Sequence, residues 1–151
     1  MIRVCFICHG NICRSPMAEF VFKDMVSKSG LSDRFEITSA ATSREELGND
    51  MYPPAKSKLR AENVPFSKRK ARQVTKEDYS YYDYLIIMEK YNFVNLCRII
   101  KDDPDSKVHL LLEFAGENSD IADPWYTGNF DKTYSDIVRG CRGLLSQLTQ
   151  E

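Results

Sequence analysis

The sequence lacks any long apolar run. Its first seven residues are too short for the apolar core of a signal peptide, no small-residue cleavage site follows them, and no segment reaches membrane-spanning length. An excess of charge is also missing, because 21 Lys and Arg residues balance 22 Asp and Glu residues. We therefore expect no nucleic-acid partner and no membrane partner. Any anion must be bound by a local group of residues.

A cysteine framework is absent too. Five cysteines, an odd number in a chain without an export signal, favour free thiols in a reducing compartment, so we expect a cytoplasmic protein. Cys5, Cys97 and Cys141 have no polar motif beside them and are expected to be buried in the core. Without repeats, linkers or low-complexity segments, residues 1–151 are expected to form one domain, long enough to bury a core without disulfides or metals.

Short apolar runs alternate with helical patterns along the chain. The expected strands are 2–7, 35–39, 84–88 and 108–112, and the expected loops are 40–52 and 116–128. The first expected helix has Ser15 as its cap and Pro16 at its first position. Four later helices are expected: two that start at Pro53 and at Thr75, and two that cover 91–100 and 134–148. This alternation predicts an α/β fold with a doubly wound parallel sheet and helices on both faces.

The loop after the first strand joins that strand to a helix N-terminus. It consists of Cys8, His9, Gly10, Asn11, Ile12, Cys13, Arg14 and Ser15. Backbone N–H groups of such a loop, together with the helix dipole, suit a phosphate dianion, and Gly10 and Asn11 tolerate left-handed dihedrals. Arg14 can bind two phosphate oxygens as a fork, and the positive surroundings favour the thiolate form of Cys8. The sequence predicts a phosphate-binding loop with a nucleophilic cysteine.

Other interpretations of this loop are weaker. The run Cys5–His9 matches the c-type haem attachment pattern, but such proteins are exported and the motif overlaps a strand. A metal site that also used Cys13 would need the strand to turn both of its cysteines toward one ion, and no second Cys/His cluster completes the ligands. We therefore expect no cofactor and no metal. Cys8 as a merely buried thiol, or a phosphate-binding module without catalysis, are the remaining alternatives.

Phosphoryl transfer to a thiolate also needs a proton for the leaving oxygen. Asp123 offers a carboxylic acid, and Trp125 and Tyr126 after it offer an aromatic wall for a phenyl phosphate. Asp before Pro is also a common turn opener, so a purely structural role for Asp123 stays open. Of the two histidines, His109 is expected to pack within its strand and His9 to frame the loop.

Taken together, these motifs resemble those of the low-molecular-weight protein tyrosine phosphatases over nearly the full length of the chain. The resemblance rests on the segments Val4–Pro16, Thr38–Thr42, Ala71–Gln73, Thr75–Asp78 and Asp123–Tyr126. It implies a four-stranded parallel sheet with the phosphate-binding loop after strand one. It also implies hydrolysis of phosphotyrosine and small aryl phosphates through a cysteinyl-phosphate intermediate, with a phosphotyrosine-containing protein or peptide as partner and a monomer or weak dimer as the active form.

The family pattern assigns individual roles to seven residues of the site. It makes Cys8 the nucleophile, Arg14 the phosphate ligand and Asp123 the general acid, while Ser15 donates a hydrogen bond to the thiolate. Asn11 and Ser39 would support the loop, and Cys13 matches the family's second thiol, which can bond Cys8 under oxidation. The remaining residues of the site are His9, Gly10, Ile12, Trp125 and Tyr126.

The chain also departs from the family pattern. Arg44-Glu45-Glu46 stands where many relatives carry an aromatic residue, and a family histidine is replaced within Ser67–Lys70, a basic run that we expect to be a solvated face or a guide for acidic peptides. A thioredoxin-coupled arsenate reductase, one alternative, needs two further cysteines where only Cys97 lies. A protein-arginine phosphatase, the other, looks to carry Thr in place of Ile12, whose longer apolar side chain favours an aryl phosphate.

Overall fold

The computed structural model describes residues 1–150, and its centre is a four-stranded parallel sheet. The strand order is β2-β1-β3-β4, which puts β1 between two parallel neighbours. The strands are β1 Ile2–Cys8, β2 Phe35–Ala41, β3 Tyr84–Ile87 and β4 Val108–Leu110. The predicted α/β fold with a four-stranded parallel sheet is therefore confirmed.

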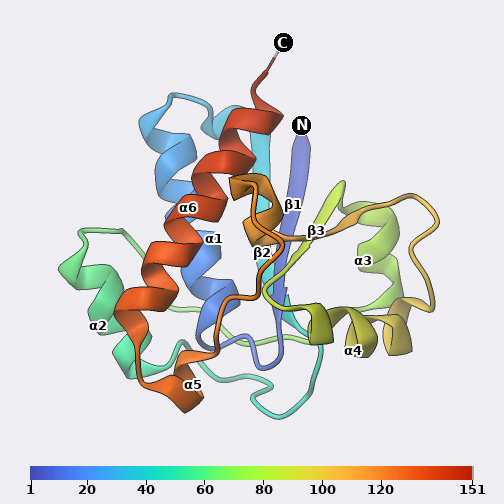
Figure 1. Cartoon of the computed structure of the whole chain (residues 1–151), viewed down its shortest axis with the longest axis horizontal. Helices are drawn as coiled ribbons and strands as arrows, with labels where there is room; N and C mark the ends of the chain where they lie inside the picture. The colour runs from blue at the N-terminus through green and yellow to red at the C-terminus, as the bar shows by residue number, and fades with distance from the viewer. Residues whose placement is uncertain (151) are drawn as a thin grey trace.

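Helices cover both faces of the sheet, as Figure 1 shows. One face carries α1 (Arg14–Lys28), α2 (Pro53–Ala61) and α6 (Phe130–Leu148), and the other carries α3 (Lys76–Tyr81) and α4 (Lys90–Ile100). None of the helices within residues 1–150 is long and apolar enough to cross a membrane.

The central strand β1 is buried on both of its faces. Val4 and Phe6 belong to the core under α1 and α6, whereas Cys5 and Ile7 belong to the second core under α4. Alternate side chains of a strand point to opposite faces, so a strand covered on both sides needs apolar residues at every position. This explains the continuous apolar run near the N-terminus, and it fixes the loop after Cys8 at the carboxyl edge of the sheet.

Several element boundaries differ from those expected. β2 extends two residues beyond 35–39, to Ala41, which pairs with Cys8 of β1. The expected strand 108–112 ends at Leu110, and Leu111–Ala115 forms a 3₁₀ helix, η2, instead. The expected loop 116–128 contains one helical turn, α5 (Pro124–Thr127). The last helix, α6, begins at Phe130, four residues before the expected start at Tyr134. The limits of β3 and α4 differ by only one residue from those expected.

Two individual predictions about side chains were wrong, and one was confirmed. Helix α1 begins at Arg14 with Cys13 at its N-cap position, so Ser15 lies inside the helix and does not cap it. Cys97 is only half-buried, because it lies on the flank of α4 and not in either core. Thr75 does form the expected capping box with Asp78 at the start of α3.

Helix α6 lies against η2 with almost no space between the two backbones. A Cβ atom on Gly140 would come within 2.5 Å of Leu111 Cγ, and one on Gly143 would come within 1.9 Å of the Phe114 carbonyl oxygen. Only glycine permits this approach. The contact holds the end of the sheet and the segment leading to α5 against the long final helix.

We expect the substitution Gly143→Ala to lower the free energy of unfolding by about 1–3 kcal/mol. The added methyl group collides with backbone that must shift, and this cost exceeds the gain of about 1 kcal/mol from replacing glycine within a helix. Urea unfolding followed by circular dichroism measures the difference. Ser146→Ala, at an exposed position of the same helix, should change the midpoint little. An unchanged midpoint for Gly143→Ala would show that η2 moves aside freely.

Candidate active site

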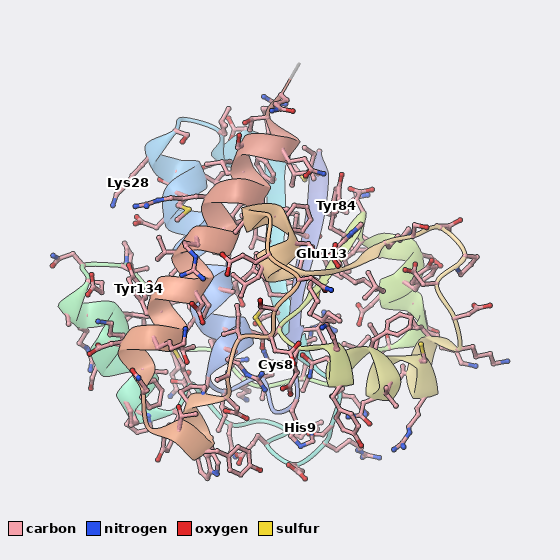
Figure 2. All side chains as sticks on the ribbon, viewed as in Figure 1. Cys8, His9, Lys28, Tyr84, Glu113 and Tyr134 are labelled. Carbon is pink, nitrogen blue, oxygen red and sulfur yellow. The ribbon has the colours of Figure 1, made fainter. Side chains whose placement is uncertain are left out.

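Three segments that are far apart in the sequence form one cleft at the carboxyl edge of the sheet. The floor is the loop from Cys8 to Arg14, with Cys8 and His9 marked in Figure 2. The loop after β2 adds Glu45 and Glu46, and the α5 segment adds Asp123, Trp125 and Tyr126. The structure thus brings together every predicted site residue except Ser15 and Ser39, which lie buried behind the floor.

The sulfur of Cys8 lies at the floor among hydrogen-bond donors. The backbone N–H groups of Asn11 and Ser15 donate to Cys8 Sγ at 3.3 and 3.4 Å, and Ser15 Oγ lies 3.0 Å from it. Ser15 Oγ accepts a bond of 2.7 Å from Asn11 Nδ2, which leaves its own proton to point at the sulfur. Three donors and the N-terminus of α1 therefore face one sulfur atom, an arrangement that attracts negative charge to this point of the cleft.

Asn11 gives the loop its shape. Its backbone is left-handed, with φ at 61°, and its side chain is fully buried. The amide nitrogen donates to Ser15 and, at 3.0 Å, to Ser39, while the amide oxygen accepts from Arg69 Nη2 and from the backbone N–H of Arg72 at 3.3 Å. The Ser39 hydroxyl in turn donates a hydrogen bond of 2.6 Å to Glu19 Oε1. Every hydrogen-bonding position of the amide is therefore used.

Gly10, unlike Asn11, does not have the left-handed conformation that its residue type allows. A Cβ atom at Gly10 would meet Glu46 Cγ at 3.5 Å, an ordinary contact distance. Asn11 alone therefore provides the turn of the loop that the sequence assigned to both residues.

Arg69 corrects the expectation that the basic run Ser67–Lys70 is a solvated face. Lys68 and Lys70 are exposed, but Arg69 is half-buried and reaches Asn11 from behind the loop. Its guanidinium also donates to the Asn49 carbonyl at 3.4 Å. Burial lowers the pKa of Arg69, yet a guanidinium stays charged at neutral pH. A short run of basic residues has no periodicity that shows which one turns inward, so this contact has no signal in the sequence.

Arg14 is 1% exposed and is held on several sides. Its Nη1 donates to the Ile121 carbonyl at 2.9 Å, and its Nη2 lies 3.3 Å from Glu89 Oε1 and 3.4 Å from Asp123 Oδ2. Burial alone lowers the pKa of Arg14, but the negative charges of Cys8 and then Glu89 outweigh it, so the pKa is raised above its ordinary value. Arg14 is thus a permanent, fixed cation in the cleft.

Glu89 was missed by the sequence analysis, although a signal for it exists. It lies two residues after the end of β3, as the loop of Cys8 follows β1. Polar residues that follow parallel strands meet at the same edge of the sheet. A search of that edge for charged residues would have placed Glu89 near Arg14.

Asp123 is the N-cap residue of α5. Its Oδ1 accepts from the backbone N–H of Trp125 at 3.0 Å, which leaves Oδ2 facing Arg14. Trp125 and Tyr126 are exposed beside the cleft, and the Trp125 ring lies 4.6 Å from the ring of Tyr52. The carboxyl group and the aromatic wall expected from the sequence therefore occur together.

The two histidines have different surroundings. His9 Nε2 lies 2.7 Å from Glu45 Oε2 at the edge of the cleft, so it links two of the segments that form the site. His109 packs between Tyr84 and Phe114, with ring centroids 5.9 and 5.6 Å away, on the edge strand β4 and outside the cleft. The expected packing role of His109 and framing role of His9 agree with these contacts.

The other cysteines have environments that favour neutral thiols. Ile12 and Cys13 pack against Ala71, and burial, followed by the negative charge of Cys8, raises the pKa of Cys13 to about 12. Cys5 and Cys141 are fully buried, and burial raises the pKa of each thiol. Within residues 1–150 no group of three or more His, Cys, Asp or Glu side chains is placed to hold a metal ion.

Comparisons with known proteins agree on one family. The family model described as low molecular weight phosphotyrosine protein phosphatase matches residues 3–151. The low molecular weight protein-tyrosine-phosphatase YfkJ of Bacillus subtilis is 37% identical over 100% of this chain and 98% of its own length. Its crystal structure superposes with a TM-score of 0.93 over 98% of this chain and 94% of that one, at 38% identity.

Two more distant proteins are similar over comparable lengths. The low molecular weight phosphotyrosine protein phosphatase of Homo sapiens is 36% identical over 95% of this chain and 94% of its own. A Drosophila arginine phosphatase is 26% identical, with a TM-score of 0.89 over 99% of both chains.

We expect Arg69→Met to lower the free energy of unfolding by about 1–3 kcal/mol. The methionine keeps most of the apolar stem but removes the charged donor to the buried oxygen of Asn11, which then keeps only the bond from the Arg72 backbone N–H. Losing a hydrogen bond to a charged group costs about that much. Lys68→Met, one position away and exposed, is the matched control and should change stability by less than about 0.5 kcal/mol. Equal unfolding midpoints in urea for the two variants would contradict a structural role for Arg69.

Proposed function

Because this chain belongs to the low molecular weight phosphotyrosine protein phosphatase family, we propose that it hydrolyses phosphotyrosine in proteins and peptides, and small aryl phosphates, with Cys8 as nucleophile. The observation that carries this proposal is the position of Cys8 Sγ among inward-facing N–H donors. Arg14 and Asp123 line the same cleft. No other part of the described chain gathers a nucleophile, an anion site and an acid in this way.

The first chemical step transfers the phosphoryl group to the enzyme. Loop N–H groups and the Arg14 guanidinium bind the equatorial phosphate oxygens, and the Cys8 thiolate attacks phosphorus opposite the ester oxygen. The P–O bond to the tyrosine breaks as the S–P bond forms. Asp123 donates its proton to the departing phenolate, so that tyrosine leaves as a neutral phenol.

The second step releases phosphate. Asp123, now a carboxylate, takes a proton from a water molecule that attacks the phosphocysteine. The S–P bond breaks, inorganic phosphate forms, and the electron pair returns to Cys8 as a thiolate. The Ser15 hydroxyl, 3.0 Å from this sulfur, is placed to stabilise the leaving thiolate by a charge-assisted hydrogen bond.

The walls of the cleft favour an aryl ester. Ile12 lines it together with Trp125 and Tyr126, and this apolar surface suits the flat ring of phosphotyrosine. Arginine phosphatase activity is the second candidate, and the similarity to the Drosophila arginine phosphatase favours testing it. Thioredoxin-coupled arsenate reduction is disfavoured, because Cys13 is the only further cysteine among the described residues of the cleft.

The proposal also covers the compartment, the domain organisation and the oligomeric state of the enzyme. We place the reaction in the cytoplasm, because a nucleophilic thiolate needs a reducing compartment. We also propose that residues 1–151 act as one catalytic domain, as a monomer or weak dimer, on phosphoproteins.

Cys8→Ser should abolish hydrolysis of a phosphotyrosine peptide while retaining phosphate binding, because a serine hydroxyl is scarcely ionised at neutral pH. The wild type should hydrolyse that peptide much faster than a matched phosphoarginine peptide. The control variant is Cys97→Ser, which changes a cysteine outside the cleft and should keep the wild-type rate. Phosphate release measures turnover, and calorimetry with inorganic phosphate measures binding. Turnover by Cys8→Ser would exclude Cys8 as nucleophile, and a preference for phosphoarginine would replace the proposed substrate.

Asp123→Asn should lower kcat for phenyl phosphate by roughly 10²–10⁴, the range for a lost general acid. Asparagine is an equally good helix N-cap, so α5 should keep its place and KM should change little. The loss should be smaller for p-nitrophenyl phosphate, whose leaving group needs no proton. Asp105→Asn, at an exposed position that does not line the cleft, is the control. Equal losses for both esters would count against acid catalysis by Asp123.

A further inference from the structure

The rim of the cleft has the opposite charge from its floor. Arg14 and the loop N–H groups make the floor positive, whereas Glu45 and Glu46 line the cleft from the loop after β2. Among the described residues that line the cleft, Arg14 is the only arginine or lysine. His9 is the one further side chain that can carry positive charge there, and it contacts Glu45.

The two glutamates are fixed in place at this rim. Glu45 Oε2 lies 2.7 Å from His9 Nε2, and Glu46 Oε2 accepts a hydrogen bond of 2.6 Å from Asn49 Nδ2. The loop that carries them is itself tied to the floor, because the Ser43 backbone N–H donates to the His9 carbonyl at 3.1 Å. The rim is therefore a built part of the site, and its carboxylates stay beside the entrance.

Both carboxylates keep capacity for a further partner. The contacts above engage one oxygen of each, and an ionised carboxylate has about four acceptor positions. The side chain of Glu45 is 69% exposed, so a cation on a bound peptide can reach it.

The basic run Ser67–Lys70 does not offset this charge. Arg69 is turned to the back of the loop, where it bonds to Asn11, and no residue of the run lines the cleft. Arg44, next to Glu45 in the chain, is exposed and does not line the cleft either. A peptide that enters the site therefore meets carboxylates at the rim before its phosphate reaches the cationic floor.

We infer that Glu45 and Glu46 select phosphotyrosine peptides that carry lysine or arginine next to the phosphotyrosine. The inference rests on the proposed function, because that function places the peptide in this cleft. A tyrosine side chain is short, so residues flanking a phosphotyrosine on the floor must lie against the rim. Basic flanks are attracted there and acidic flanks are repelled, while the phosphate itself is bound by Arg14 and the loop.

The test compares three phosphotyrosine peptides that differ only in their flanking residues, which are lysine, glutamine or glutamate. The wild type, Glu45→Gln, Glu46→Gln, the double variant and Glu77→Gln are assayed for kcat/KM on each peptide. Glutamine keeps the size and the hydrogen-bonding oxygen but removes the charge. Glu77 is exposed on α3 and does not line the cleft, so it is the matched control.

We expect the wild type to favour the lysine peptide over the glutamate peptide about tenfold at low ionic strength, as attraction and repulsion at the two rim carboxylates combine. This ratio should shrink in about 0.5 M salt, where charges are screened within a few ångströms. Each single variant should reduce the ratio and the double variant should bring it near one, while Glu77→Gln keeps it.

Two results would overturn the inference alone: equal kcat/KM values for the three peptides with wild type, or a lysine preference that persists in the double variant. Failure of folded wild type to hydrolyse any of the three peptides would instead overturn the proposed function, and this inference with it. The two failures are distinguishable, because the first still requires hydrolysis of phosphotyrosine.

Discussion

The floor of the cleft depends on one buried side-chain amide, that of Asn11. A left-handed backbone costs an ordinary L-residue roughly 1–2 kcal/mol, and asparagine accepts it when local hydrogen bonds compensate. Here Arg69 and Arg72 donate to the amide oxygen, while the nitrogen donates to Ser15 and Ser39. The loop cannot change shape without leaving buried polar groups unpaired, so the same bonds that stabilise it also fix the donors around the sulfur of Cys8.

Positive and negative side chains of the site lie at different depths in the cleft. Arg69 lies behind the loop and supports it, whereas Arg14 faces the cleft, restrained by Glu89 and the carbonyl of Ile121. A guanidinium held in this way need not reorganise when a phosphoryl group is transferred, which is how fixed dipoles and charges accelerate reactions. Carboxylates lie at the sides and rim, where Glu89 restrains the cation. We propose that Asp123 exchanges a proton there and that Glu45 and Glu46 face the remainder of a substrate.

The fold could be predicted wherever a local pattern was sufficient. The apolar run Val4–Ile7 before Cys8 and the helical spacing after it specify a buried strand, a loop and a helix, whatever the rest of the chain does. The run Leu111–Ala115 shows where this fails, since an apolar stretch has the same composition in a strand as in a 3₁₀ helix. It leaves the sheet because Gly140 and Gly143 allow α6 to lie directly against it.

The sequence by itself determined the residues to which we assign the proposed chemistry. Cys8 and Arg14 are six positions apart in one loop, and Asp123 precedes a helix-starting proline and aromatic residues. Each of the three can therefore be identified from the residues next to it in the chain. Tertiary structure decided what supports them: Arg69 meets Asn11 across 58 positions, and Glu89 meets Arg14 across 75. No local periodicity encodes such pairs, because they form only when the packed fold brings separate loops together at one edge of the sheet.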